Sequence, residues 1–152
     1  MRRQTAGFTG IEILVVLVIG GILLAMALPA FGRAIARRGA LNARDALVTM
    51  GARARSVAIE RGATVTLGVA VDEGRAWIAE GPDTLDVLDY SGEFDAKLAA
   101  IRNASLLEIC FSPRGVGGAC DATTVLPDTV TFTRGPHTAR AAIRVLGQVS
   151  RL

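Results

Sequence analysis

The chain has 152 residues, of which 51% are hydrophobic and 20% are charged, and its formal net charge is +3. An apolar run near the N-terminus supplies much of the hydrophobic content, and the 120 residues that follow it are enough for one hydrophobic core but not for two. Two of the basic residues are Arg2 and Arg3, so the other charges nearly balance. The net charge therefore says little about nucleic-acid binding.

The apolar run covers residues 13–32, which are 20 consecutive residues without a charge. As a helix rising about 1.5 Å per residue, they would span roughly 30 Å, the thickness of a bilayer core. Arg2 and Arg3 precede the run, and short basic ends tend to stay in the cytoplasm. The pattern predicts one membrane span with a cytoplasmic N-terminus and the rest of the chain on the outer side.

Two residues do not fit a plain membrane anchor. Glu12 lies at the start of the run, and an ionised carboxylate at mid-membrane costs about 2.5–3.5 kcal/mol, less near the interface. Glu12 is therefore either solvated at the headgroup level or paired with a partner. Pro29 lies well inside the run and cannot donate an amide hydrogen bond, so we expect it to kink or locally loosen the helix.

The residues around Glu12 form a motif, Gly7-Phe8-Thr9-Gly10-Ile11-Glu12, with basic residues before it and the apolar run after it. This motif resembles the cleavage and methylation site of type IV prepilins and type II secretion pseudopilins. The resemblance implies that residues 1–7 are a leader peptide, that a prepilin peptidase cuts after Gly7, and that the new amino terminus at Phe8 is N-methylated. It also implies that Glu12 is an assembly residue, whose carboxylate meets the amino terminus of a neighbouring subunit. Gly10 departs from the large aliphatic residue that the family commonly has there, which weakens local packing.

The helix is expected to continue past the membrane. Apolar residues recur at spacings of three and four, which is typical of one buried stripe on an amphipathic helix. They are Ala40, Ala43, Leu47, Met50, Ala54, Val57 and Ala58. The pattern predicts a helix over residues 9–61, ending at Gly62 and open to interruption near Pro29 or Gly39. Residues 8–32 would be its transmembrane and assembly part, and residues 33–62 its amphipathic half.

Residues 63–152 are expected to form a β-rich globular domain, because the hydrophobic period changes to alternation after Gly62. The predicted strands are residues 64–71, 75–79, 85–88, 105–112, 129–133, 139–146 and 148–151, with a weak helical pattern over residues 93–101. Trp77 is the only tryptophan, and we expect it to anchor the core rather than to bind a ligand. The fold class is α+β, with a long N-terminal helix packed on an antiparallel sheet.

Two segments of this domain resemble the GspH/FimT branch of the pseudopilins. One is residues 54–62 followed by a strand rich in threonine and valine, and the other is Phe-Ser-Pro-Arg-Gly at residues 111–115 followed by a hairpin and a terminal strand. The resemblance implies a pilin fold. Gln148 follows Gly147 where the family often carries arginine, so a role assigned to that arginine does not transfer.

Cys110 and Cys120 are the only cysteines. An exported domain would lie in the oxidising periplasm, where such a pair is expected to form a disulfide, whereas two free thiols would be the default in the cytosol. With the single histidine, His137, the two thiols do not supply the four ligands of a zinc site. We expect no metal and no cofactor.

The sequence gives little support for an enzyme. It contains no nucleophile elbow and no Gly-x-x-x-x-Gly-Lys phosphate loop. His137 follows Gly135-Pro136 at an expected hairpin tip, where it would be exposed and without a chemical role. The chain is therefore predicted not to be an enzyme.

Charge is unevenly distributed along the chain. Residues 33–61 contain seven arginines against Asp45 and Glu60, and residues 72–95 contain eight carboxylates against Arg75. Such blocks are usually solvated surface. They could also make complementary contacts between subunits, or the basic block could contact anionic lipid headgroups.

Two alternatives to a pilin subunit stay open. The apolar run could be a secretory signal that is cleaved after Ala27 and releases a soluble periplasmic binding domain. The protein could instead be a DNA-binding minor pilin used in DNA uptake, because its C-terminal region has a basic excess. The candidate DNA contacts are Arg134, Arg140, Arg144 and Arg151.

The main prediction is a minor pseudopilin or minor pilin of the GspH/FimT type. Such a subunit supports fibre assembly and protein secretion in a type II secretion system, or primes a type IV pilus. Its expected partners are other major and minor pilins, the prepilin peptidase and the inner-membrane assembly platform. It would be a single-pass protein of the bacterial inner membrane with a periplasmic C-terminal domain.

Overall fold

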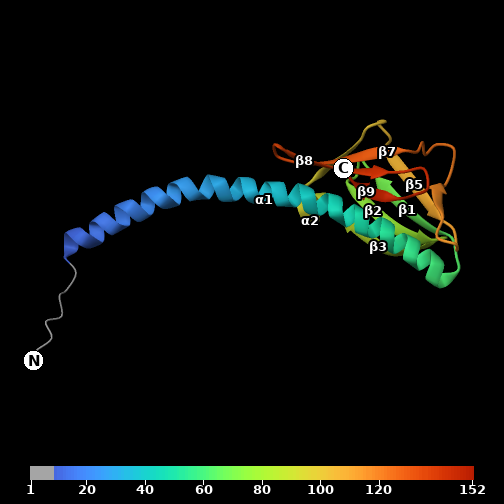
Figure 1. Cartoon of the computed structure of the whole chain (residues 1–152), viewed down its shortest axis with the longest axis horizontal. Helices are drawn as coiled ribbons and strands as arrows, with labels where there is room; N and C mark the ends of the chain where they lie inside the picture. The colour runs from blue at the N-terminus through green and yellow to red at the C-terminus, as the bar shows by residue number, and fades with distance from the viewer. Residues whose placement is uncertain (1–8) are drawn as a thin grey trace, which may run out of the picture. The chain divides into compact units, whose positions relative to one another are not determined.

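The computed structural model describes residues 9–152, and its first element is a helix, α1, that spans Gly10–Arg61. The chain divides into two compact units, Met1–Ile35 and Ala36–Leu152, and α1 contributes to both (Figure 1). The predicted helix over residues 9–61 is confirmed to within one residue. An interruption near Pro29 or Gly39 is not seen, because losing one amide donor leaves the hydrogen bonds of the neighbouring turns in place.

Nine strands and one short helix follow α1 in the second unit. In chain order they are β1 (Val65–Ala70), β2 (Arg75–Glu80), β3 (Asp83–Asp89), α2 (Tyr90–Phe94), β4 (Lys97–Ala100), β5 (Leu106–Phe111), β6 (Gly117–Ala119), β7 (Asp128–Arg134), β8 (His137–Ile143) and β9 (Val149–Arg151). All strand pairs are antiparallel. The predicted α+β class with antiparallel pairing is confirmed.

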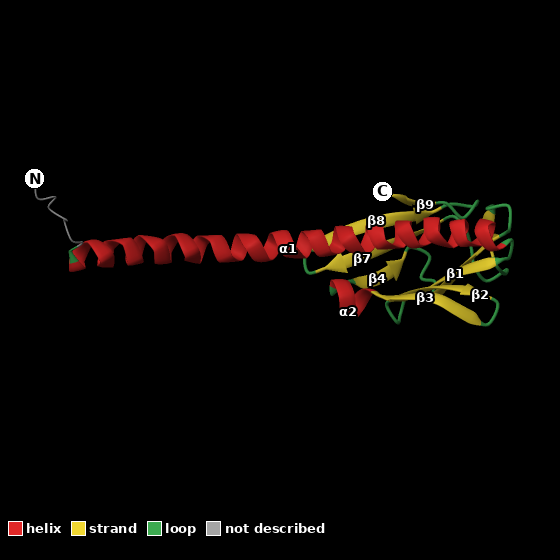
Figure 2. Ribbon diagram, turned by 90° about the horizontal axis from the view of Figure 1, so that it is seen from below, coloured by secondary structure: helices red, strands yellow, loops and turns green. Residues whose placement is uncertain are grey.

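The strands form two sheets rather than the single sheet that the sequence suggested. The first sheet has the order β3-β2-β1-β5-β6, and the second has the order β4-β7-β8-β9. Figure 2 shows the second unit's part of α1 running along both sheets. The helix can therefore bury the inner faces of two sheets at once.

The hydrophobic core lies between the second half of α1 and the two sheets. All three elements contribute fully buried side chains: α1 contributes Leu47 and Ala54, the first sheet contributes Leu67 and Ile109, and the second sheet contributes Phe132. Six of the seven stripe residues predicted on α1 are buried, and Val57 is half-buried. The amphipathic pattern therefore identified the face of α1 that packs on the domain.

Close contact between α1 and the second sheet depends on two glycines of the same stripe. A Cβ atom on Gly51 would lie 2.6 Å from Cγ2 of Val149, and one on Gly39 would lie 2.2 Å from Nη1 of Arg134. Any larger residue would push the helix away from β9 or displace the arginine. These positions carry no hydrophobic signal, and only their place within the apolar stripe marks them.

The predicted weak helix over residues 93–101 is wrong. Helix α2 ends at Phe94, Asp95 adopts a left-handed conformation with φ of 51°, and Lys97–Ala100 forms strand β4. Strand β4 pairs with β7, so Leu98 lies opposite Phe132. Tertiary pairing thus overrides the local helical pattern.

Candidate assembly site

The first unit presents an unpartnered apolar helix. Its large side chains are mostly more than half exposed, for example Ile11 at 73%, Leu17 at 69% and Phe31 at 72%. An 18-residue window of α1 near the N-terminus has a mean hydropathy of 2.8 and no buried residue, so in length and composition this helix can cross a membrane. Apolar side chains all round a helix need lipid or other helices as neighbours.

Glu12 lies in the first turn of α1 and is exposed. Its amide donates a hydrogen bond to the carbonyl oxygen of Thr9 at 3.0 Å, so the side chain sits at the positive end of the helix dipole. Residues 9–152 offer this carboxylate no ion-pair partner. An ion-pair partner for Glu12 would have to come from outside these residues.

The other residues of the predicted processing site lie at or before the edge of the described chain. Gly7 and Phe8, the predicted cleavage and methylation residues, lie outside the described residues. Pro29 lies inside α1, and a kink there stays a prediction.

Ion pairs in the second unit join α1 to both sheets. Arg61 Nη1 lies 2.8 Å from Glu80 Oε2 of β2, and Arg53 pairs with Asp86 of β3. At the second sheet, Arg151 Nε of β9 lies 3.0 Å from Asp45 Oδ1. Part of the basic block at residues 33–61 is thus matched by the acidic block of the same chain. Exposed pairs of this kind contribute about 0–1 kcal/mol each and mainly fix the position of the helix.

The four arginines proposed as DNA contacts do not gather on one surface. Arg134 lies over Gly39 with its Nε 3.5 Å from Asp95, and Arg151 pairs with Asp45, so both are directed toward α1. Arg140 is exposed between the buried residues Ala139 and Ala141 of β8, which places it on the opposite face of the second sheet. Arg144 is exposed in the turn before β9. No shared cationic groove is formed by the four.

The predicted disulfide between Cys110 and Cys120 is confirmed. Cys110 lies in β5 opposite Gly118 of β6, and Cys120 follows β6 directly, with its amide donating to the carbonyl oxygen of Glu108 at 3.1 Å. The bridge therefore fastens the short edge strand β6 to the first sheet.

Among residues 9–152, no group of three histidine, cysteine or acidic side chains is placed to hold a metal ion. His137 begins β8 beside the Gly135-Pro136 tip, but it is half-buried rather than exposed. Its Nε2 atom is buried and has no hydrogen-bond partner within the described chain.

Tyr90 is fully buried beside Phe94 and Phe132, and burial raises the pKa of its hydroxyl.

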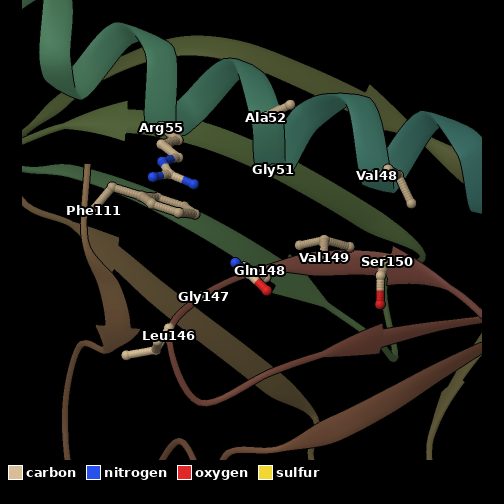
Figure 3. A pocket seen from close by; sticks show the side chains of 10 residues that line it. All are labelled: Val48, Gly51, Ala52, Arg55, Phe111, Leu146, Gly147, Gln148, Val149 and Ser150. Carbon is tan, nitrogen blue, oxygen red and sulfur yellow. The ribbon is translucent and has the colours of Figure 1, made fainter.

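A hollow that the sequence did not reveal lies between α1 and the end of the second sheet (Figure 3). Its lining residues come from three separate parts of the chain. They are Val48, Gly51, Ala52, Arg55, Phe111, Leu146, Gly147, Gln148, Val149 and Ser150. Two of them are glycines against which another part of the chain packs closely: Val149 approaches Gly51, and Gly117 approaches Gly147. These two glycines are the only hint of the hollow in the sequence.

Comparison with known families matches two stretches of the chain. Residues 43–148 match the family model described as type II transport protein GspH, and residues 2–28 match the prokaryotic N-terminal methylation motif. No curated protein sequence matches the chain.

Two solved structures share the fold. The type IV minor pilin FimU of Pseudomonas aeruginosa is 15% identical, with a TM-score of 0.56 over 76% of this chain and 90% of its own. The minor pseudopilin EpsH from the type 2 secretion system of Vibrio cholerae is 12% identical, with a TM-score of 0.55 over 74% of this chain and 95% of its own. At these identities the likeness concerns the fold alone.

Proposed function

Because the chain belongs to the GspH family of type II transport proteins, a family of structural fibre subunits, we propose that it is a minor pseudopilin or minor pilin of a periplasmic fibre. In this proposal a prepilin peptidase cuts the chain after Gly7, and the new amino terminus at Phe8 is N-methylated. The fibre belongs either to a type II secretion system or to a type IV pilus.

The observation that carries the proposal is the methylation motif followed directly by an exposed apolar helix with a carboxylate in its first turn. In a signal sequence or a plain anchor, the Glu12 carboxylate would only raise the free energy of inserting the helix into lipid. In a fibre subunit it has a role, since its charge can be neutralised by a cation of another subunit.

Assembly follows from electrostatics. Cleavage leaves an ammonium group at Phe8, and Glu12 of a neighbouring subunit supplies the opposite charge. Each charge is costly in lipid when alone, and pairing them removes most of that cost only when the two helices are in register. The pair would therefore select the correct stagger between subunits as the helix leaves the membrane.

The apolar part of α1 suits an inner-membrane anchor before assembly and a helical fibre core after it. The basic end at Arg2 and Arg3 supports a cytoplasmic N-terminus and a periplasmic second unit. The proposed partners are other major and minor subunits, the peptidase, and the inner-membrane assembly platform.

The test is incorporation of a Glu12→Gln variant into fibres. We expect the variant to be processed and to insert in the membrane as the wild type does, because a neutral glutamine needs less free energy to enter lipid than an ionised glutamate. Its amount in sheared fibres, measured by immunoblot against a major subunit, should fall about tenfold or more, because the Phe8 ammonium then lacks its partner.

Glu60→Gln is the matched control, because Glu60 is an exposed glutamate near the other end of the same helix and makes no ion pair within residues 9–152. This control should enter fibres at the wild-type level. Wild-type incorporation of the Glu12→Gln chain would overturn the proposed role of Glu12. A wild-type chain absent from every fibre fraction would overturn the proposed function itself.

A further inference from the structure

We propose that the hollow beside β9 is a docking site for an acidic, partly apolar segment of a neighbouring fibre subunit. The β9 hollow is defined here by Val48, Gly51, Ala52 and Arg55 of α1 together with Leu146 and Val149. This inference rests on the proposed function, because it takes the occupant from the same fibre.

The hollow has a volume of about 330 Å³, which is room for one or two large apolar side chains. It opens where the edge strand β9 of the second sheet meets α1, and Gly51 lets β9 come close enough to form one wall. Leu146 at its rim is 64% exposed, and the adjacent Val145 is 58% exposed. Exposed apolar side chains gathered at a hollow mark a surface that is covered in an assembly.

The walls of the hollow are held in place. The turn that carries Leu146 is closed by a hydrogen bond from the Gly147 amide to the Arg144 carbonyl oxygen at 2.9 Å. Gly147 has φ of +69°, and a Cβ atom there would lie 2.8 Å from the Cα atom of Gly117. This turn therefore rests directly on β6 of the first sheet. A pre-formed hollow loses little conformational entropy when a partner enters it.

Arg55 gives the hollow its charge preference. It is the only charged residue in the lining, and within residues 9–152 it makes no ion pair. Figure 3 shows its side chain descending from α1 toward Phe111, at one end of the hollow. An occupant that places a carboxylate near this guanidinium gains a charge-assisted hydrogen bond, whereas a basic occupant is repelled.

The same fold displays a segment of the required chemistry. Val87 of β3 is 54% exposed on an edge strand of the first sheet, and Asp83 of the same strand is exposed and makes no ion pair within residues 9–152. A hollow on one subunit that receives an acidic edge of the next is a head-to-tail contact, and such contacts build open helical filaments. Lipid phosphates or nucleic acid fit less well, because a single arginine in an apolar lining offers no cluster of cations.

The experiment places a photo-crosslinking amino acid, benzoylphenylalanine, at Leu146 of the full-length chain in fibre-producing cells. Ile101 is the matched control position, because it is also a large apolar residue and is 63% exposed. After irradiation, mass spectrometry should identify an adduct between position 146 and an acidic segment of another pilin-type subunit, with no such adduct from position 101.

Two variants test the chemistry of the site. Arg55→Glu should lower the adduct yield about fivefold or more, because it reverses the charge at the hollow. Ala52→Phe should lower it to a similar degree by filling the space. Arg102→Glu is the control, because Arg102 is exposed and makes no ion pair within residues 9–152, and it should leave the yield unchanged.

The inference is overturned if position 146 gives no more adduct than position 101, if the adducts contain only phospholipid or nucleic acid, or if both site variants crosslink at the wild-type level. Sheared fibres from the same cells separate this failure from a failure of the proposed function. A chain present in fibres without the adduct refutes the docking site alone, and a chain absent from fibres refutes both.

Discussion

Trp77 lies across Gly68 on the face of the first sheet that points away from α1. The two residues are directly opposite each other in the β1–β2 pair, and Leu67 and Val69, on either side of Gly68, are fully buried in the core. Side chains alternate along a strand, so Gly68 and Trp77 share the outer face. The expectation that Trp77 anchors the core is therefore wrong, and the tryptophan instead covers the backbone of β1 from outside.

A Gly68→Ala substitution should lift this ring from the sheet. The added Cβ would lie 2.3 Å from both Cε2 and Cζ2 of Trp77, so the ring must move. We expect a red shift of the tryptophan emission maximum and a loss of stability of about 1–3 kcal/mol, as is typical of overpacking.

Fluorescence and thermal unfolding of the full chain in detergent measure these two effects. Gly118→Ala is the control, because Gly118 lies in the same sheet and an added Cβ there meets nothing within 4 Å. An unchanged emission maximum in the Gly68→Ala variant would show that Trp77 does not lie on Gly68.

Helix α2 shows how a short element depends on one cap. A single oxygen, Oδ1 of Asp89, accepts hydrogen bonds from the Ser91 amide at 2.9 Å, the Gly92 amide at 3.0 Å and the Ser91 hydroxyl at 2.7 Å. The helix has only five residues, so these bonds are a large part of what defines it. The cap could not be recognised from sequence, because the pattern placed the helix several residues later.

This cap should make the segment sensitive to acid. The Gly92 amide, with the Ser91 hydroxyl and amide, holds the pKa of Asp89 below its usual range. The pKa of Asp89 is therefore lower in the folded than in the unfolded chain. The cap's contribution to the free energy of unfolding is then fully present above the unfolded pKa of about 3.9, and it is lost as the pH falls through the folded pKa.

Titration of the Asp89 carboxyl by ¹³C NMR should give a midpoint below that of an unfolded aspartate. An Asp89→Ala chain should lose protection of the Ser91 and Gly92 amides at neutral pH, whereas Asp83→Ala in the same strand, with no such hydrogen bonds, should not. A midpoint at or above the unfolded value would contradict the capping role.

Elements with a long, regular pattern were predictable from sequence, and elements set by their neighbours were not. The sequence predicts five elements to within one or two residues: α1, β1, β2, β5 and β7. In each of them, apolar residues recur at helical or strand spacing along the face that is buried. Strand β6 has only Gly-Gly-Ala and no period, and its pairing with β5 places it in the first sheet. Strand β4 likewise depends on pairing with β7.

The candidate site was predictable only in part, for a related reason. The motif around Glu12 is local in sequence, so the assembly residue could be proposed without a structure. The β9 hollow joins the middle of α1 to the last turn of the chain, and no local pattern reports that contact. Arg55 therefore appeared only as one member of a basic block.

Across the whole molecule, the disulfide closes a loop at the edge of the first sheet, where β6 would otherwise be held by few contacts. Replacing both Cys110 and Cys120 by alanine should lower the free energy of unfolding by roughly 3 kcal/mol in the loop-entropy model. Thermal unfolding of the full chain, followed by circular dichroism in detergent, measures the change. Reduced wild-type protein should behave like the variant, and equal melting temperatures for oxidised and reduced protein would contradict a stabilising role.

The apolar helix and Glu12 can act in a fibre only if the chain is first processed after Gly7. The most direct measurement is the mass of the N-terminal peptide of the protein isolated from membranes. We predict a peptide that begins at Phe8 and carries one methyl group on its amino nitrogen. A mature chain that begins at Leu28 would indicate a cleaved secretory signal, and a chain that keeps Met1–Gly7 would show no processing. Either result would contradict the proposed role as a fibre subunit.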